Sequence, residues 1–188
     1  NVLNWALIND EKFFGVSVHF IDEGIDTGDL ILQKKYKIRD KDNYSSLLIR
    51  ASNHCSALLY KAIISIKERT FKKIKQSCID KKGSYYRGRN KDDEFIKWSN
   101  SGRKIFNHIR AISEPGPGAK TKVNDDLLIL NSSIFKKNKI SKNFKPGTII
   151  SIKKGILAIK TIDGILNVKK YIYLSKENKL KAGIVLKS

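Results

Sequence analysis

Four carboxylates stand close together near the start of the chain, and they are its densest group of chemically capable side chains. Asp22, Glu23, Asp26 and Asp29 fall within the eight residues DEGIDTGD. Such a cluster could bind a divalent metal, act in acid/base catalysis, or form a solvated turn. The spacing does not fit an EF-hand, which needs acids at alternate positions and a closing glutamate. Residue types alone leave the alternatives open and favour the solvated turn.

The cysteines predict no second site. Cys55 and Cys78 form no CxxC pair and have no ring of histidines around them, so we expect no metal. Cys55 falls on an apolar helical face, where we expect a small buried hydrophobe in a reducing cytosol. No stretch approaches the roughly 20 apolar residues of a membrane span, and charged residues at 10–12 interrupt the only candidate leader. The sequence therefore predicts a cytoplasmic protein without a membrane partner.

The formal net charge of +20 is unevenly distributed. Residues 117–188 contain 16 lysines, no arginine and four acidic residues, a net charge of +12. A surface of this charge attracts polyanions and could bind nucleic acid. Compositional drift is the alternative, since the chain is rich in Lys, Ile and Asn throughout and lacks the arginine that reads phosphate best. Both explanations stay open.

The acidic loop lies between two predicted strands. Residues 15–21 alternate and are β-branched, and residues 30–38 return to strand character. A short helix is expected at 1–8, and residues 44–66 carry apolar side chains every three or four positions, which predicts one long amphipathic helix. Strand, loop, strand and helix in this order fit the edge of an α/β domain. The units are too few for a complete doubly wound sheet, so we expect an N-terminally truncated domain.

The second half of the chain has a different pattern. Residues 67–90 are basic and weakly patterned, as in a linker, and residues 99–112 predict a helix with Ser99 or Ser101 as its N-cap. Short apolar runs separated by turn residues follow, at 127–130, 148–152, 155–161 and 165–168. Strands at this spacing predict a small antiparallel barrel.

Several blocks of the chain resemble one enzyme family. The segment GVSVHFIDEGIDTGDLILQ at 15–33 resembles the signature of the 10-formyltetrahydrofolate-dependent formyltransferases. That family includes methionyl-tRNA formyltransferase, the amino-sugar-nucleotide N-formyltransferases and glycinamide ribonucleotide formyltransferase. Further similar blocks are NVLNWALINDEK at 1–12, SYYRGRNKDDEFIKW at 84–98 and IFNHIRAISEPGPGA at 105–119.

The resemblance implies a fold class and a domain layout. It implies an α/β protein in which the C-terminal part of a Rossmann-like formyltransferase domain is followed by a small OB-like β-barrel. Residues 1–82 would form the partial catalytic domain, and residues 83–98 a linker. Residues 99–188 would form a helix and the OB-like C-terminal domain.

The resemblance also assigns roles within the acidic loop. Asp26 corresponds to the catalytic aspartate of the family's D-T-G or D-G-G triplet, and His19 would support the loop. The reaction moves a formyl group from 10-formyltetrahydrofolate, the co-substrate, to an amine, and it needs oxyanion donors and a proton relay. Backbone groups of the loop are expected to hold the pterin ring. The implied folate wall is Ile21, Asp22, Glu23, Gly24, Ile25, Thr27 and Gly28.

The sequence departs from the family pattern in one respect. The family's catalytic Asn-x-His would lie before Asn1, and neither His54 nor His108 has a matching context. We therefore expect residues 1–188 alone to show no appreciable formyl transfer, and measurable turnover with formyltetrahydrofolate would contradict this.

The acceptor of the formyl group has three interpretations. The motifs NWALIN, VHFIDEGIDTGD and YYRGRNKDD look closer to the enzymes that formylate nucleotide-linked amino sugars, which we take as the expected acceptor class. The basic tail favours initiator methionyl-tRNA instead, since a basic OB-like barrel suits nucleic acid. The third is a non-catalytic basic fragment that binds nucleic acid. The oligomeric state is not predicted.

Overall fold

The structure is a computed structural model, and the residues it describes are 1–81, 83–138, 144–175 and 178–188. The chain divides into two compact units, each with its own packing. We call the first the hairpin unit, which comprises Glu11–Lys41 and Ser46–Arg87. The other is the sheet unit, which comprises Asn1–Asp10, Asp42–Ser45 and Gly88–Ser188. No helix in the described ranges is long and apolar enough to cross a membrane.

The hairpin unit is built on two antiparallel strands. These are β1 (Phe13–His19) and β2 (Leu30–Lys37), paired in register from Phe13 with Lys37 to His19 with Leu30. A shift in register between Val18 and His19 marks the end of the ladder next to the acidic loop. Both predicted strands are confirmed, although the first begins and ends two residues earlier than expected.

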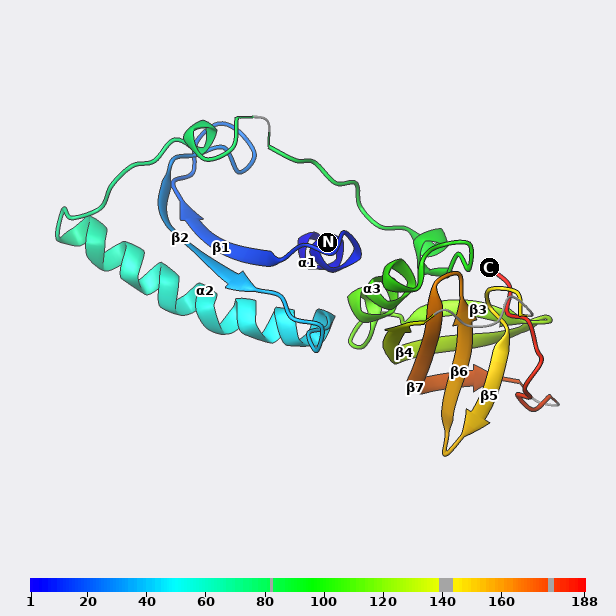
Figure 1. Ribbon diagram of the computed structural model, residues 1–188. Coiled ribbons are helices and arrows are strands. Elements are labelled where there is room, and N and C mark those ends of the chain that lie inside the picture. The colour runs from blue at the N-terminus through cyan, green and yellow to red at the C-terminus, as the bar shows by residue number, and fades with distance from the viewer. Residues whose placement is uncertain (82, 139–143, 176–177) are drawn as a thin grey trace. The chain divides into compact units, whose positions relative to one another are not determined.

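Helix α2 (Tyr44–Lys67) runs along one face of the hairpin (Figure 1), and the long predicted helix is confirmed. The ring of His54 stacks on Tyr36 with centroids 4.2 Å apart. Arg50 donates a 3.0 Å hydrogen bond to the carbonyl oxygen of Lys37, and its guanidinium lies over the ring of Phe14. The helix is therefore attached to both strands by aromatic and charged side chains.

The apolar stripe of α2 is only partly covered. Its buried members are Leu47, Leu58 and Ala62, and its exposed members are Leu48, Cys55, Leu59, Ile63 and Ile66. The expected burial of Cys55 is therefore wrong. Two strands about 4.8 Å apart can cover only a narrow line on a helix, and Cys55 lies outside it.

The chain after α2 pairs back onto the hairpin. Ile74 forms an antiparallel bridge with Leu30 through backbone N–O distances of 2.8 and 3.0 Å. The ring of Phe71 meets the ring of Phe20 edge-on at 5.8 Å, and the 3₁₀ helix η1 (Gln76–Cys78) follows. The linker expected at 67–90 thus contains a docked segment, which the sequence hides because one bridge leaves no periodic pattern.

Two helices form one layer of the sheet unit. Helix α1 (Val2–Ile8) packs on α3 (Gly102–Ile112), and α3 packs on the sheet. The side chain of Ser101 caps α3 by accepting a 3.4 Å hydrogen bond from the backbone N–H of Lys104, so the predicted helix begins at 102 rather than 99. The apolar side chains of α3 are buried, at Ile105, Phe106, Ile109 and Ile112.

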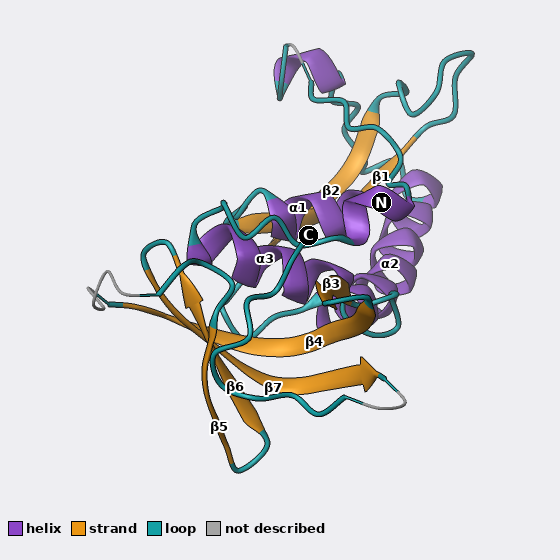
Figure 2. Cartoon of the chain, turned by 90° about the vertical axis from the view of Figure 1, so that its right-hand side faces the viewer, coloured by secondary structure: helices purple, strands orange, loops and turns teal. Residues whose placement is uncertain are grey.

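A five-stranded antiparallel sheet forms the other layer (Figure 2), in the order β3-β4-β7-β6-β5. The strands are β3 (Ala119–Val123), β4 (Asp126–Lys137), β5 (Ile149–Lys153), β6 (Ile156–Thr161) and β7 (Gly164–Leu174). Four overlap predicted strands, although β4 and β7 extend well beyond the predicted 127–130 and 165–168. The fifth, β3, was not predicted, because its sequence AKTKV buries an alanine and a threonine where strong apolar alternation was sought.

The C-terminal residues connect the two edge strands of this sheet. Lys187 exchanges backbone hydrogen bonds of 2.9 and 3.0 Å with Lys122 of β3. In the same segment, the N–H of Gly183 donates to the carbonyl oxygen of Ile149 in β5, and the N–H of Ile149 donates to the carbonyl oxygen of Ile184, at 2.8 Å each. Residues 183–187 thus link β3 with β5. The OB-like assignment stays a prediction.

The 3₁₀ helix η2 (Lys91–Glu94) precedes α3 in the chain. It is capped by reciprocal hydrogen bonds between Asn90 and Asp93.

A partly buried ionic network links the end of α1 to α3. Arg103 donates hydrogen bonds of 2.7 to 3.2 Å to the carboxylate of Asp10, which adopts a left-handed backbone with φ 59°. Arg110, only 6% exposed, lies 3.5 Å from the same carboxylate and donates to Asn107. The single carboxylate of Asp10 therefore interacts with two guanidinium groups just after the end of the first helix.

We expect Asp10→Asn to lower the free energy of unfolding by about 1–3 kcal/mol, because it removes a negative charge that lies 3.5 Å from the buried Arg110 and accepts hydrogen bonds from Arg103. Asparagine tolerates the left-handed backbone, so the substitution isolates the charge. Chemical denaturation of both proteins measures the difference. Equal midpoints would contradict the role given to Asp10.

His108 makes the stability of the sheet unit depend on pH. Burial lowers the pKa of His108, and the charge of Arg89 lowers it further, against a hydrogen bond and charge from Asp93 that raise it. Its Nε2 has no hydrogen-bond partner among the described residues. Below pH 6.5, the ordinary value, the unfolded chain takes up a proton that the folded chain does not, so stability falls.

We therefore expect the melting temperature of the wild-type protein to fall between pH 7 and pH 5 by more than that of His108→Gln. Thermal unfolding of both proteins at the two pH values tests this. The same fall in both proteins would show that His108 does not contribute.

Candidate functional site

The acidic loop that joins β1 to β2 is closed at its base. The backbone N–H of Phe20 donates a 2.9 Å hydrogen bond to the carbonyl oxygen of Asp29. Gly28 is buried against this closure, and a Cβ at that position would lie 1.7 Å from the carbonyl oxygen of Phe20. No other residue fits there without a backbone shift, which gives the glycine of the D-T-G triplet a steric reason.

Asp22 shapes the first half of the loop. Its Oδ1 accepts hydrogen bonds from the backbone N–H of Gly24 at 3.1 Å and from the hydroxyl of Thr27 at 2.6 Å. The bond from Thr27 lowers the pKa of Asp22, with desolvation opposing it. The side chain of Asp22 therefore holds the turn as a carboxylate, and Thr27 has a structural task within the triplet.

Asp26 lies at the exposed side of the turn. Its backbone is left-handed, with φ 57°, and its side chain is 88% exposed. The carboxylate oxygen Oδ1 lies 3.7 Å from Nε2 of His19. The structure thus brings together the aspartate and the histidine that the sequence analysis singled out.

The ring of His19 is fixed by the backbone. Its Nδ1 lies 2.8 Å from the carbonyl oxygen of Phe20, which can only accept, so Nδ1 carries the proton of that hydrogen bond. A neutral ring then presents an unprotonated Nε2 to Asp26, whereas a doubly protonated ring presents a donor. The pair can therefore exchange a proton with a bound reactant in either direction.

Gln76 is a part of the site that the sequence analysis missed. Its Nε2 donates to the carbonyl oxygens of Asp26 at 2.7 Å and of Gly28 at 2.9 Å. Since 50 and 48 residues separate Gln76 from Asp26 and Gly28, no local spacing could have pointed to this contact. The bridge between Ile74 and Leu30 places Gln76 beside the loop.

The remaining predicted residues surround the turn at the surface. Ile21 and Ile25 are 95% and 93% exposed, an unusual exposure for large aliphatic side chains. The other exposed predicted residues are Asp22, Glu23, Gly24 and Thr27, while Gly28 is buried. Among the residues that the structure describes, no group of three His, Cys, Asp or Glu side chains could hold a metal ion.

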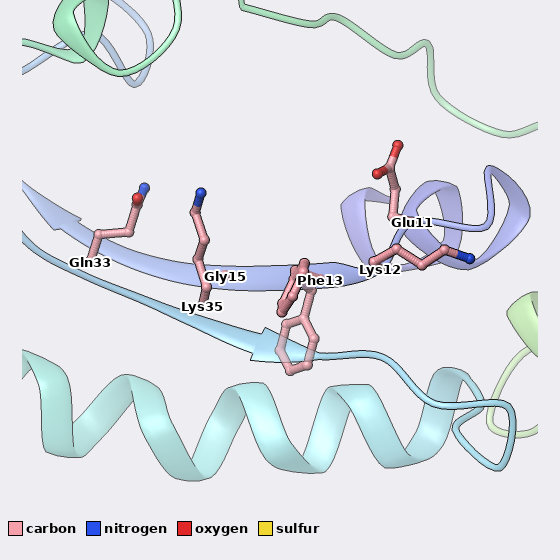
Figure 3. A pocket seen from close by; sticks show the side chains of 7 residues that line it. Glu11, Lys12, Phe13, Gly15, Gln33 and Lys35 are labelled. Carbon is pink, nitrogen blue, oxygen red and sulfur yellow. The ribbon is translucent and has the colours of Figure 1, made fainter.

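A separate hollow of about 390 Å³ opens on the hairpin. Figure 3 shows Gln33 and Lys35 of β2 pointing away from α2 into this region, with Glu11 near the start of β1. Its lining contains none of the predicted site residues, so the predicted site is the exposed loop rather than this hollow.

Comparison with known proteins identifies the same family in the N-terminal and the C-terminal part of the chain. The family model "Formyl transferase" matches residues 1–63, and "Formyl transferase, C-terminal domain" matches residues 89–185. The methionyl-tRNA formyltransferase of Clostridium tetani is 33% identical, over 98% of this chain and 61% of its own length. The methionyl-tRNA formyltransferase of Thermodesulfovibrio yellowstonii is 36% identical, over 88% of this chain and 51% of its own length. The chain thus spans about half to three fifths of these relatives.

Solved structures agree with this result. An N-formyltransferase from Helicobacter canadensis, in complex with folinic acid and dTDP-3-aminofucose, has a TM-score of 0.68 and 25% identity. The match covers 89% of this chain and 59% of that one. HypX from Aquifex aeolicus in complex with tetrahydrofolic acid shares the fold, with a TM-score of 0.66 and 20% identity over 94% and 30% of the two chains. The chain belongs to the formyl transferase family, with the loop of Asp26 in the part that matches its formyl transferase model.

Proposed function

We propose that the protein transfers a formyl group from 10-formyltetrahydrofolate to a primary amine, with Asp26 as the catalytic carboxylate. The observation that carries this proposal is the D-T-G turn, in which an exposed carboxylate at φ 57° stands 3.7 Å from His19. A carboxylate on a rigid turn can take the proton that the attacking amine must lose and return it to the leaving nitrogen. Family membership supplies the reaction class.

The folate co-substrate fits the exposed part of the loop. Residues 21–27 are exposed, so their peptide groups can meet the donor and acceptor edge of a pterin ring. Ile21 and Ile25 offer apolar area beside them for the flat ring. The related structures with folinic acid and tetrahydrofolic acid support this choice of co-substrate.

We also propose the domain layout that the sequence implies. Residues 1–82 would belong to the catalytic domain and residues 83–98 to the linker, followed by the OB-like domain at 99–188. The family model for the C-terminal domain, which matches residues 89–185, supports a separate domain in this part of the chain. Both cysteines are free and exposed, which suits a reducing cytoplasm.

The expected acceptor is a nucleotide-linked amino sugar. The related Helicobacter canadensis enzyme, whose structure contains dTDP-3-aminofucose, supports this class. Initiator methionyl-tRNA is the second candidate, and the methionyl-tRNA formyltransferases at 33% and 36% identity support it equally. The net charge of +12 over residues 117–188 favours the polyanion.

Replacement of Asp26 by asparagine tests the reaction. We expect Asp26→Asn to lower kcat for formyl transfer by roughly 10²- to 10⁴-fold, because the amide cannot accept the proton, while the turn keeps its shape. The assay uses the protein as its gene encodes it, with formyltetrahydrofolate. Asp125→Asn, in an exposed turn of the sheet unit, removes the same charge and is the control. Equal rates for Asp26→Asn and the wild-type protein would overturn the role of Asp26.

Competing acceptors decide the substrate. We expect turnover with dTDP-3-aminofucose to exceed turnover with methionyl-tRNA when both are offered with formyltetrahydrofolate. If tRNA is the true acceptor, its binding should instead weaken on the order of 10³-fold or more between about 50 and 200 mM salt. Strong salt-dependent tRNA binding without transfer to either acceptor would favour the non-catalytic binding module.

A further inference from the structure

The contact between Gln76 and the D-T-G turn has a defined chemistry. Both partners are backbone carbonyl oxygens, at 2.7 and 2.9 Å, and such oxygens can only accept. The side chain must therefore present its NH₂ group, which has one hydrogen for each carbonyl. One amide thus satisfies two acceptors on either side of Thr27, and an acceptor in its place would repel both.

One of the two carbonyls is that of Asp26 itself, and the other belongs to Gly28, at the base of the turn that carries Asp26. The left-handed backbone of Asp26 is uncommon for a residue with a Cβ, although aspartate adopts it more readily than most, and hydrogen bonds to the nearby carbonyl groups stabilise it. The side chain itself is 88% exposed, with His19 at 3.7 Å, so its direction depends on the backbone. Asp22 holds the turn from within the loop, through Thr27. Gln76 holds it from a distant segment.

The position of Gln76 is itself fixed on the base of the loop. Ile74, two residues earlier, shares two backbone hydrogen bonds with Leu30, the first residue of β2. Phe71 packs edge-on against Phe20, and the ammonium of Lys73 lies 5.0 Å from the centre of the Phe20 ring. Residues 71–76 therefore form one short segment docked on both ends of the loop, and Gln76 begins the helix η1 where this segment ends.

We infer that Gln76 is a positioning residue for Asp26: its amide fixes the carbonyl groups of Asp26 and Gly28, the residues on either side of Thr27, and so aims the carboxylate. This inference rests on the proposed formyl transfer at Asp26. The segment after α2 is then part of the active centre, although it lies outside the D-T-G signature.

Two substitutions of Gln76 separate its hydrogen bonds from its bulk. Gln76→Met keeps the length of the side chain without a donor, and Gln76→Glu places oxygens against the two carbonyls. We expect both to lower kcat/KM for formyl transfer on the order of 100-fold at neutral pH, because a misplacement of about 1 Å has this effect. Asn53→Asp, at an exposed position of α2, adds the same charge as Gln76→Glu and should keep wild-type activity.

The pH profile distinguishes positioning from general damage. A protonated glutamic acid regains one donor, so the activity of Gln76→Glu relative to wild type should rise as the pH falls, whereas that of Gln76→Met should not. In NMR spectra, the amide signals of Thr27 and Asp29, which share peptide groups with the two carbonyls, should shift in both variants. Their melting temperatures should stay close to that of the control.

Each outcome decides a different claim. Wild-type kcat/KM in both Gln76 variants would overturn the inference and leave the proposed function intact, as would equal pH profiles of the two variants. A wild-type protein without formyl transfer would instead overturn the proposed function. If the wild-type protein is inactive, the NMR spectra still test the contact of Gln76 with the carbonyls of Asp26 and Gly28. Unshifted amide signals of Thr27 and Asp29 in Gln76→Met would then overturn that contact.

Discussion

The closure of the loop between β1 and β2 is the constraint on which the candidate site depends. One hydrogen bond, from Phe20 to Asp29, ends the strand ladder and forces the chain to turn within eight residues. Gly28 lies so close to this bond that a side chain there would collide with it. The functional side chains of the candidate site lie in the turn above this closure. Asp22 and Gln76 hold the turn, and its course leaves the carboxylate of Asp26 at the surface.

The sequence predicted the elements that have a strong local pattern. Alternation gave the two strands of the hairpin, and the spacing of apolar residues gave α2 and α3. The acidic turn and His19 were found because their residue types and spacing resemble a family signature. The structure adds physical content to that signature, since Thr27 has a hydrogen-bonding task in the turn and Gly28 a steric one.

The rest could not be predicted, for three different reasons. Gln76 acts through contacts with residues about 50 positions away, and a single glutamine in a basic stretch has no periodicity. Strand β3 buries Ala119 and Thr121, whose small size hides the alternation. Cys55 has the helical spacing of a core residue, but burial also depends on the width of the partner surface, which spacing does not encode. Each failure is a tertiary effect that overrides a local pattern.

The C-terminal segment has a consequence beyond the fold of the sheet unit. An antiparallel sheet with open edges offers unpaired N–H and C=O groups to any other extended chain, and this promotes aggregation. Here residues 183–187 pair with β3 through Lys122 and with β5 through Ile149, so they occupy part of both edges. The last residues therefore protect the sheet against intermolecular strand addition. The net charge of +20 also opposes self-association by repulsion between molecules, but high salt screens this repulsion. Pairing of the edge strands does not depend on charge and therefore persists at high salt.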